Sequence, residues 1–215
     1  MKHLYIIIFV FLVNITLAQP NKAYFNISYG KVIYPFYNYD LNKNDGSYTL
    51  GFNISYFFAE KTGILTGLYY EQKNFLIDYE TNGINGWETD IESFNFEYLQ
   101  IPLQVRYVFV DIKKSIFLLK AGVDFGFLLS KNCNKVMYNG SIENCTDNYE
   151  FDKNIHNLIL GFDYNYSVYK DISINLCSEI RYNTTTNEGI HGDSGQGTEL
   201  SYIFEVGVNY KLVRD

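Results

Sequence analysis

The segment between Phe117 and Leu129 constrains the fold strongly, because every second residue in it is apolar. Lys120 and Asp124 are among the residues that alternate with the apolar ones. Side chains of a β-strand point alternately to opposite sides, so this strand would have one wholly apolar face and one face of charges and glycines. The same pattern recurs along the chain. Repeated strands of this kind are typical of a sheet that closes into a barrel within lipid.

Eight segments alternate in this way, and the connections between them alternate in length. The segments are approximately Lys22–Tyr34, Ser47–Phe58, Gly63–Asp78, Phe94–Phe109, Phe117–Leu129, Ile155–Val168, Ile172–Tyr182 and Leu200–Leu212. The short connections are Ala59–Thr62, Val110–Lys114 and Tyr169–Asp171, and the long ones are Pro35–Gly46, Tyr79–Ser93, Lys131–Asn154 and Asn183–Glu199. Outer-membrane barrels have short periplasmic turns and long extracellular loops. We therefore predict an all-β fold, an eight-stranded antiparallel up-and-down transmembrane β-barrel with both termini in the periplasm.

The start of the chain has the composition of an export signal. A positively charged beginning is followed by an apolar run from Leu4 to Val13 and then by a short segment that ends in Ala18. These three parts are typical of a secretory signal peptide. The alternative is a membrane anchor, but a spanning helix needs about 20 apolar residues. We predict a signal peptide over residues 1–18, cleaved near Ala18, and an outer-membrane barrel domain over residues 19–215.

The composition agrees with a barrel that lies in a membrane. Aromatic residues make up 18% of the 215 residues, with 21 Tyr and 17 Phe, and such residues favour strands and membrane interfaces. Charged residues make up 19%, against roughly 25% in a soluble domain. The net charge of -7 and the lack of a basic cluster exclude a nucleic-acid partner. The sequence has no glycine-rich phosphate loop and no zinc-ligand spacing, so we expect no cofactor and no metal.

One segment resembles a known family. The residues from Tyr98 to Tyr107 read YLQIPLQVRY, which resembles the YLxIPLxxxY signature of the PorT-like outer-membrane β-barrel proteins of Gram-negative bacteria. The signature positions here are Tyr98, Leu99, Ile101, Pro102, Leu103 and Tyr107. The resemblance implies an eight-stranded barrel of the OmpA/OmpX-like kind and no single activity. Because proline has no N–H to donate, we expect a bulge or a break in strand pairing at Pro102.

The assigned strand faces place charged side chains in the barrel interior. The expected interior charges are Glu71, Lys73, Glu97, Arg106, Lys120, Asp124, Asp163, Glu179, Arg181, Glu205 and Lys211. An eight-stranded barrel is just wide enough for side chains to fill it. Unpaired buried charges are costly, so we expect these nearly balanced charges to pair with one another. The alternative is a path for ions or protons.

The three cysteines divide into a candidate pair and a single residue. Cys133 and Cys145 lie in the same long connection, and the cell surface is oxidising, so we predict a disulfide between them. Free thiols or a metal site are the alternatives. Cys177 falls on the inner face of its strand and is expected to act as a small buried residue.

The sequence offers no convincing catalytic group. A barrel hydrolase would need a histidine within hydrogen-bond reach of a serine and an acid. His156 and His191 are scattered, and Ser130, Asp193 and Ser194 are only loosely near them. No motif fixes these groups together, so we expect no catalytic residues.

Two features of the long connections remain open. Trp87 is expected at a loop tip, where it would either anchor a partner or a glycan or pack over the barrel mouth. Another long connection carries four acidic residues, interpreted as a solvated face rather than a Ca²⁺ site. These are Glu143, Asp147, Glu150 and Asp152.

The function expected from the sequence is non-enzymatic. We expect a protein of the outer membrane that is exported through the periplasm and has a structural or surface-interaction role through its extracellular loops. The expected partners are outer-membrane lipid and other envelope proteins or extracellular ligands. Two alternatives are kept: a small lipid-modifying enzyme of the outer membrane, and a secreted soluble barrel that binds a small apolar ligand in its interior.

Overall fold

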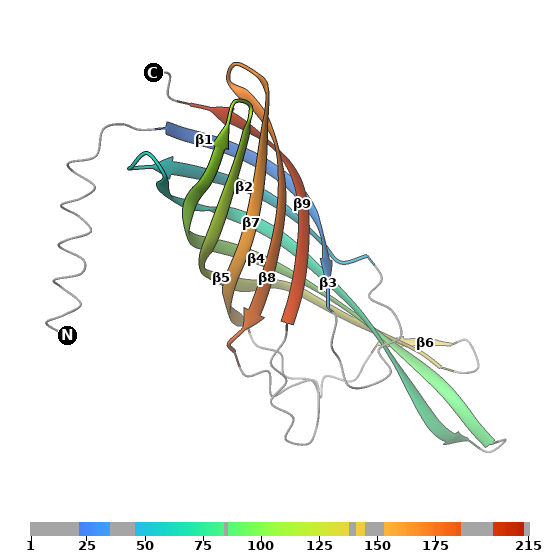
Figure 1. Cartoon of the computed structure of the whole chain (residues 1–215). Coiled ribbons are helices and arrows are strands. Elements are labelled where there is room, and N and C mark those ends of the chain that lie inside the picture. The colour runs from blue at the N-terminus through green and yellow to red at the C-terminus, as the bar shows by residue number, and fades with distance from the viewer. Residues whose placement is uncertain are drawn as a thin grey trace, which may run out of the picture.

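The computed structural model describes residues 22–34, 46–83, 86–137, 141–144, 153–185 and 200–212. Its strands are β1 (Lys22–Ile33), β2 (Tyr48–Phe57), β3 (Thr62–Gly83), β4 (Gly86–Ile112), β5 (Ser115–Val136), β6 (Ile142–Asn144), β7 (Asn154–Tyr169), β8 (Ile172–Asn183) and β9 (Leu200–Lys211). They form one curved antiparallel wall (Figure 1). Within the described residues, no helix is long and apolar enough to cross a membrane.

The wall closes on itself. The strands follow the order β4-β3-β2-β1-β9-β8-β7-β5, and a further pairing between β4 and β5 joins the two ends. The three-residue strand β6 pairs only with the far end of β5, so the closed wall has eight strands. A closed sheet has no edge strand within the membrane, where unpaired backbone groups would be costly. The predicted eight-stranded antiparallel barrel is confirmed.

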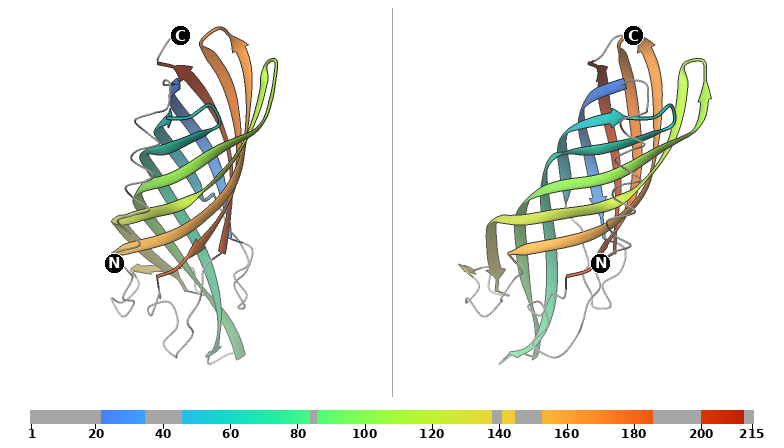
Figure 2. Two further views of the ribbon diagram at one scale, coloured as in Figure 1. Left: turned by 60° about the vertical axis from the view of Figure 1, so that its left-hand side comes forward. Right: turned by 90° about the vertical axis from the view of Figure 1, so that its left-hand side faces the viewer.

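The short turns and the ends of β1 and β9 lie together at one end of the barrel (Figure 2). The Ser167 N–H donates to the Lys114 carbonyl at 2.8 Å, which joins the turns after β4 and β7. The Lys211 N–H donates to the Asp171 carbonyl at 2.8 Å, which joins the end of β9 to the same region. Lys113 takes a left-handed φ of 51° in the two-residue turn between β4 and β5. We call this end the turn end.

One expected loop is instead regular strand. The segment Tyr79–Ser93 belongs largely to β3 and β4, which pair without interruption as far as Gly83 and Gly86. Polar residues and glycines made this segment resemble a loop, but the alternation that starts at Phe75 continues through it. Strands β3, β4 and β5 contain 22, 27 and 22 residues. Since about 9–11 tilted residues cross a bilayer, these three strands project beyond the barrel (Figure 1).

The two faces of the wall have the reverse polarity of a soluble protein. Outward side chains such as Leu103 and Leu160 are apolar and 54% and 61% exposed, whereas inward Gln100 and Glu179 are polar and 1% exposed. The alternation of burial runs along the strands wherever side chains are described, and it matches most of the faces assigned from the sequence. An exposed apolar wall of this extent is suited to lipid. A secreted barrel with an apolar interior, one of the alternatives, is therefore wrong.

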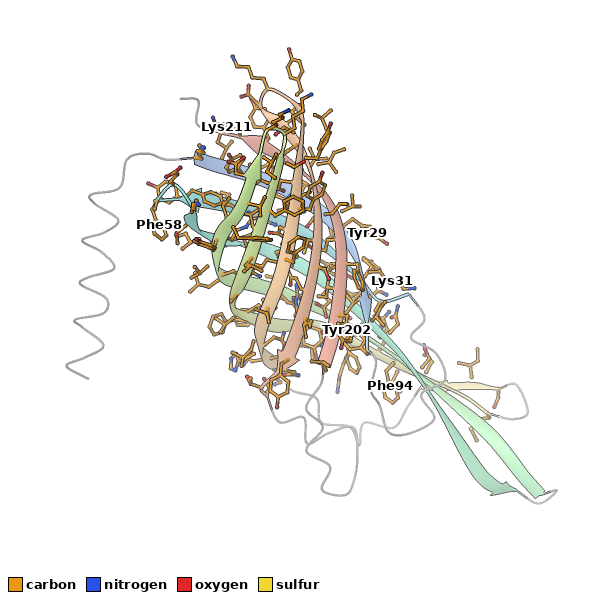
Figure 3. All side chains as sticks on the ribbon, in the orientation of Figure 1. Tyr29, Lys31, Phe58, Phe94, Tyr202 and Lys211 are labelled. Atoms are coloured by element: carbon orange, nitrogen blue, oxygen red, sulfur yellow. The ribbon has the colours of Figure 1, made fainter. Side chains whose placement is uncertain are left out.

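Aromatic and charged side chains lie toward both ends of this apolar wall (Figure 3). Tyr29, Lys31 and Tyr202 lie on the side toward the projecting strands, and Phe58 and Lys211 lie at the turn end. Phe58 is buried, as is its neighbour Phe57. The strand alternation ends there, because β2 stops at Phe57.

Pro102 interrupts one ladder, as expected. The pairing of β3 with β4 omits Ile101 and Pro102 and resumes in the same register on both sides. Pro102 therefore marks a break in pairing and not a bulge. The register shifts of β4 lie elsewhere, at Glu97/Tyr98 and at Val108/Val110, both against β5.

Candidate functional site

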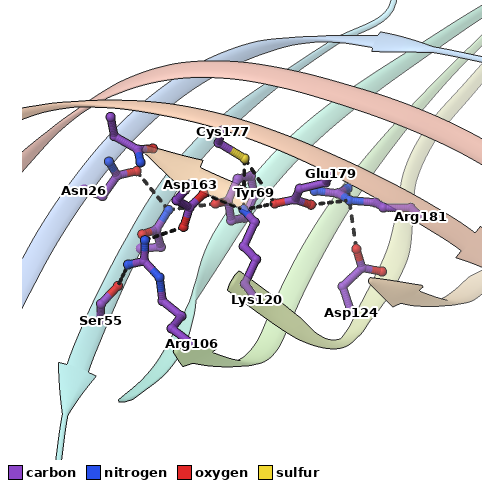
Figure 4. Close-up of polar contacts among 12 residues, drawn as sticks. Asn26, Ser55, Tyr69, Arg106, Lys120, Asp124, Asp163, Cys177, Glu179 and Arg181 are labelled. Atoms are coloured by element: carbon purple, nitrogen blue, oxygen red, sulfur yellow. Dashed lines mark hydrogen bonds and ion pairs between the residues drawn. The ribbon is translucent and has the colours of Figure 1, made fainter. Parts of the chain in front are cut away.

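The charged interior is organised around Lys120, which reaches inward from β5. Its Nζ lies 2.5 Å from Glu179 Oε1 and 3.2 Å from Asp163 Oδ1. The same ammonium donates to Cys177 Sγ at 2.9 Å. One cation thus serves two carboxylates that come from β7 and β8 (Figure 4).

Arg106 of β4 extends this group toward the turn end. It pairs through Nη2 with Asp163 Oδ2, and its Nη1 donates to Ser55 Oγ at 2.5 Å. Asp163 therefore bridges the two cations Lys120 and Arg106. A carboxylate held between two cations keeps its charge neutralised where water is excluded.

Arg181 of β8 extends the group in the other direction. Its Nε donates to Glu179 Oε2 at 3.1 Å, and its Nη1 donates to Glu71 Oε2 at 2.8 Å. Asp124 Oδ2 lies 3.5 Å from the same Nη1, and Gln100 accepts a further hydrogen bond from it. Glu179 thus joins the Lys120 and Arg181 parts into one network.

The network fills the middle of the barrel. A cavity among Tyr69, Arg106, Lys120, Asp163 and Glu205 has a volume of only about 10 Å³, close to the least space that holds one water. All the ion-paired side chains named above are buried. In the described lumen these groups neutralise one another and occupy the space that a solute would need.

Glu205 differs from the other interior carboxylates because it forms no ion pair among the described residues. Its Oε1 is also buried there without a hydrogen-bond partner. It faces Gly30 of β1, where an added Cβ would lie 2.5 Å from Glu205 Cγ. The described interior holds five buried carboxylates and four buried cations, so one negative charge is in excess. The carboxylates are Glu71, Asp124, Asp163, Glu179 and Glu205, and the cations are Lys73, Arg106, Lys120 and Arg181.

Three of these groups have donor atoms close enough for a metal ion. One ligand atom each from Cys177, Glu179 and Glu205 lies within 4.8 Å of the others. The ammonium of Lys120 already contacts the first two. The protein therefore supplies its own cation at this point.

A ladder of asparagines lies beside the ion pairs and was not foreseen as a unit. Asn53 donates to Asn26 at 3.1 Å, and Asn26 donates to Asn209 at 2.8 Å. Asn209 and Asn175 both donate to Asn165, at 2.7 and 2.8 Å. The ladder crosses β2, β1, β9, β7 and β8. The strand register brings their amides into contact.

Most of the charged residues expected in the interior lie there, but the prediction for Glu97 is wrong. Arg106, Lys120, Asp124, Asp163, Glu179, Arg181 and Glu205 are all buried in the lumen. Glu97 is half-buried and shares the outward parity of Leu99 and Ile101. It hydrogen-bonds with Tyr70 on the outer wall of β3. The alternation along β4 already places Glu97 on the same side as Leu99 and Ile101, so its assignment to the interior was wrong.

The residues of the family signature divide between the two faces of β4. Tyr98 and Pro102 are buried inside the barrel. The other four, Leu99, Ile101, Leu103 and Tyr107, face outward. The signature thus describes a strand of the wall and brings together no cluster of reactive side chains.

The cysteines are described in part. Cys133 lies on β5 and is disulfide-bonded, whereas Cys145 lies outside the described residues, so their pairing stays a prediction. Cys177 is free and buried.

The remaining sequence candidates are dispersed. The His156 ring packs edge-on against Phe125 at 5.5 Å between ring centres, and Ser130 lies on β5 opposite Glu97. Trp87 lies on β4 opposite Asn82, and Glu143 lies on β6. The other candidates fall outside the described residues; they are Asp147, Glu150, Asp152, His191, Asp193 and Ser194.

A second cavity, of about 200 Å³, opens at the turn end. Phe57, Val108 and Leu118 form its buried apolar floor. Charged side chains of the strand ends, among them Lys22 and Lys170, surround it. This cavity mixes apolar, basic and acidic lining and favours no single ligand chemistry.

The chain is similar to known membrane barrels. Residues 18–185 match the family described as outer membrane protein beta-barrel domain. Ail, the attachment invasion locus protein of Yersinia pestis, superposes with a TM-score of 0.50 at 12% identity, over 90% of this chain and 100% of that one. Neisserial surface protein A gives 0.50 at 11% identity (89% and 96% covered), and OprG of Pseudomonas aeruginosa gives 0.50 at 12% (92% and 99% covered). Such identities show a shared fold alone. No curated protein sequence matches the chain.

Proposed function

Since the chain belongs to the outer-membrane protein β-barrel family and lies in the outer membrane, we propose that it is a non-enzymatic barrel with a structural or surface-interaction role through its extracellular part. The observation that carries this proposal is the contrast between the barrel interior and the strands that project from it. The lumen is filled with its own ion pairs, while β3, β4 and β5 extend far past the wall.

The filled lumen supports a role that does not depend on transport. A channel needs a lumen wider than an eight-stranded barrel provides when side chains occupy it. The partners of this proposal are lipid around the wall and envelope proteins or external ligands at the projecting strands.

The sequence supports two further parts of the proposal. Residues 1–18 act as a cleaved export signal, and the mature chain begins near Gln19. Within the outer-membrane barrels, the chain belongs with the PorT-like proteins, because Tyr98, Pro102 and Tyr107 match their signature. A lipid-modifying enzyme is not favoured, since the described ring contact of His156 is with Phe125.

A photo-crosslinker tests the interaction role in intact cells. Placed at Trp87, near the tip of the β3–β4 hairpin, it should give protein adducts. Placed at Val206, which is exposed on the apolar wall, the same crosslinker should give lipid adducts only. An absence of protein adducts at position 87, together with ion conductance of the purified barrel in planar bilayers, would contradict the proposal.

A further inference from the structure

Among the described residues, the projecting part of β3 has a free edge. Strand β2 pairs with β3 only as far as Tyr48 opposite Gln72. Ser47 then caps the ladder, because its Oγ accepts the Asn74 N–H at 3.0 Å. In the part of the chain that the structure describes, nothing pairs with this side of β3 from Phe75 to Gly83. Figure 2 shows the hairpin of β3 and β4 extending beyond the barrel, at the end opposite the short turns.

The contact with Ser47 shows which backbone groups lie on that edge. Both the N–H and the carbonyl of Asn74 face Ser47, at 3.0 and 3.5 Å. Backbone groups of a strand alternate between its two sides. The free edge therefore carries the N–H and carbonyl groups of every second residue after Asn74, while those between them bond to β4. The edge residues are Leu76, Asp78, Glu80 and Asn82.

Of the usual protection against pairing, this edge has only the acidic residues Asp78 and Glu80. Exposed edges are normally blocked by charged side chains, above all lysine, by proline, by a bulge or by short length. Residues 75–83 contain no proline and no lysine, and their register with β4 has no shift. The segment is a regular strand with one side open.

The charge of the hairpin indicates what could pair there. From residue 75 to residue 94 the sequence contains five acidic residues and no lysine or arginine, and Lys135 of β5 lies opposite Glu92 on the far side of β4. The acidic residues are Asp78, Glu80, Glu88, Asp90 and Glu92. A second copy of the chain would place acidic residues opposite acidic residues, which is destabilising in a sheet. A basic segment would be attracted instead.

We propose that the free edge of β3 binds an extended, basic segment of a partner protein by strand addition. The partner forms main-chain hydrogen bonds with the four edge residues, and its lysines or arginines meet the acidic hairpin. This inference rests on the proposed surface-interaction role and specifies the site and the chemistry of the partner.

The test uses the full barrel in lipid nanodiscs and synthetic peptides of about ten residues, a typical strand length. The probe alternates lysine with valine or threonine, and its control carries glutamate in place of lysine. The basic peptide should bind, and a ¹³C-labelled version should show an amide I infrared band of β-structure. Binding should weaken with salt, since exposed charges are screened.

Two variants at one position separate hydrogen bonding from charge. Glu80→Pro removes the side-chain charge and an edge N–H, but it removes no donor to β4. Glu80→Ala removes the charge alone. Binding to the proline variant should be weaker than to the alanine variant by roughly fivefold, the effect of one net hydrogen bond.

Equal binding to the two variants, or binding without the β-structure band, overturns strand addition. Equal binding of the glutamate control peptide overturns the basic partner. Protein adducts at position 87 in cells, combined with no binding of the basic peptide, would contradict only the strand addition proposed here. The surface-interaction role would still be supported. An absence of those adducts, together with ion conductance of the purified barrel, would contradict the proposed function itself.

Discussion

Lys120 and Glu179 stabilise the interior through contacts that neither could make alone. Glu179 accepts from Lys120 at 2.5 Å and from Arg181 at 3.1 Å, so its carboxylate neutralises two cations in a region without bulk water. Glu205 forms no ion pair with a cation among the described residues. Two glutamates on neighbouring strands therefore contribute to stability in opposite ways.

Glu179→Gln should destabilise the barrel by roughly 3–5 kcal/mol, the cost of removing one partner from a buried ion pair. Glu205→Gln should leave the free energy of unfolding unchanged or raise it, because it removes an unpaired buried charge. Urea unfolding in lipid vesicles, followed by heat-modifiable migration on gels, measures both. The same large loss in the two variants would show that Glu205 is paired in the folded barrel.

Gly122 lies where two strands approach closely. An added Cβ would overlap the Leu103 carbonyl and lie 2.6 Å from Gln104 Cα, both backbone atoms of β4. At Gly126 the nearest atoms belong to the flexible side chain of Ile155. Gly122→Ala should therefore cost about 1–3 kcal/mol or prevent assembly, and Gly126→Ala should cost less. The yield of heat-modifiable protein after refolding compares the two, and a reversed order would contradict this backbone contact.

The hairpin of β3 and β4 is an element whose removal should spare the barrel. Replacing residues 75–94 by Asn-Gly joins Asn74 to Asn95, which are already opposite each other, through a two-residue turn. All the interior ion pairs remain, so the free energy of unfolding should stay within about 2 kcal/mol of the original. Failure of this variant to show heat-modifiable migration would mean that the hairpin is needed for folding.

The end of β5 carries a second element-scale prediction. If Cys133 pairs with Cys145, then Cys145→Ser should release one thiol that reacts with an alkylating reagent without prior reduction. Mass spectrometry detects the added group at Cys133. An unreactive Cys133 in this variant would show that the disulfide has another partner, and Cys177→Ser provides the matched control.

The sequence predicts the elements well because the period-2 pattern determines which face of each strand meets lipid. Outward Leu158 and Leu160 and inward Asp163 follow from that pattern alone. The hairpin beyond Asp78 was missed, since outside the membrane a strand needs no apolar face and its sequence resembles a loop. Glu97 was misplaced although its parity with Leu99 and Ile101 puts it on the outer face.

At the scale of the whole molecule, closure brings together residues that are far apart in the chain. Arg181 meets Glu71 across 110 positions, and no spacing in the sequence indicates this pair. The sequence predicted that interior charges would neutralise one another. The particular partners, the asparagine ladder and the unpaired Glu205 depend on strand register and could not be predicted from composition.

Impermeant maleimide labelling of single cysteines in intact cells tests the central claim, a closed outer-membrane barrel with its short turns in the periplasm and its hairpin outside. The two positions are Thr81→Cys in the projecting part of β3 and Lys113→Cys in the turn after β4, and the unmodified chain gives the background. Thr81→Cys should label in intact cells, and Lys113→Cys should label only after the outer membrane is permeabilised. Labelling of Lys113→Cys but not of Thr81→Cys in intact cells, or equal labelling of both, would contradict the account.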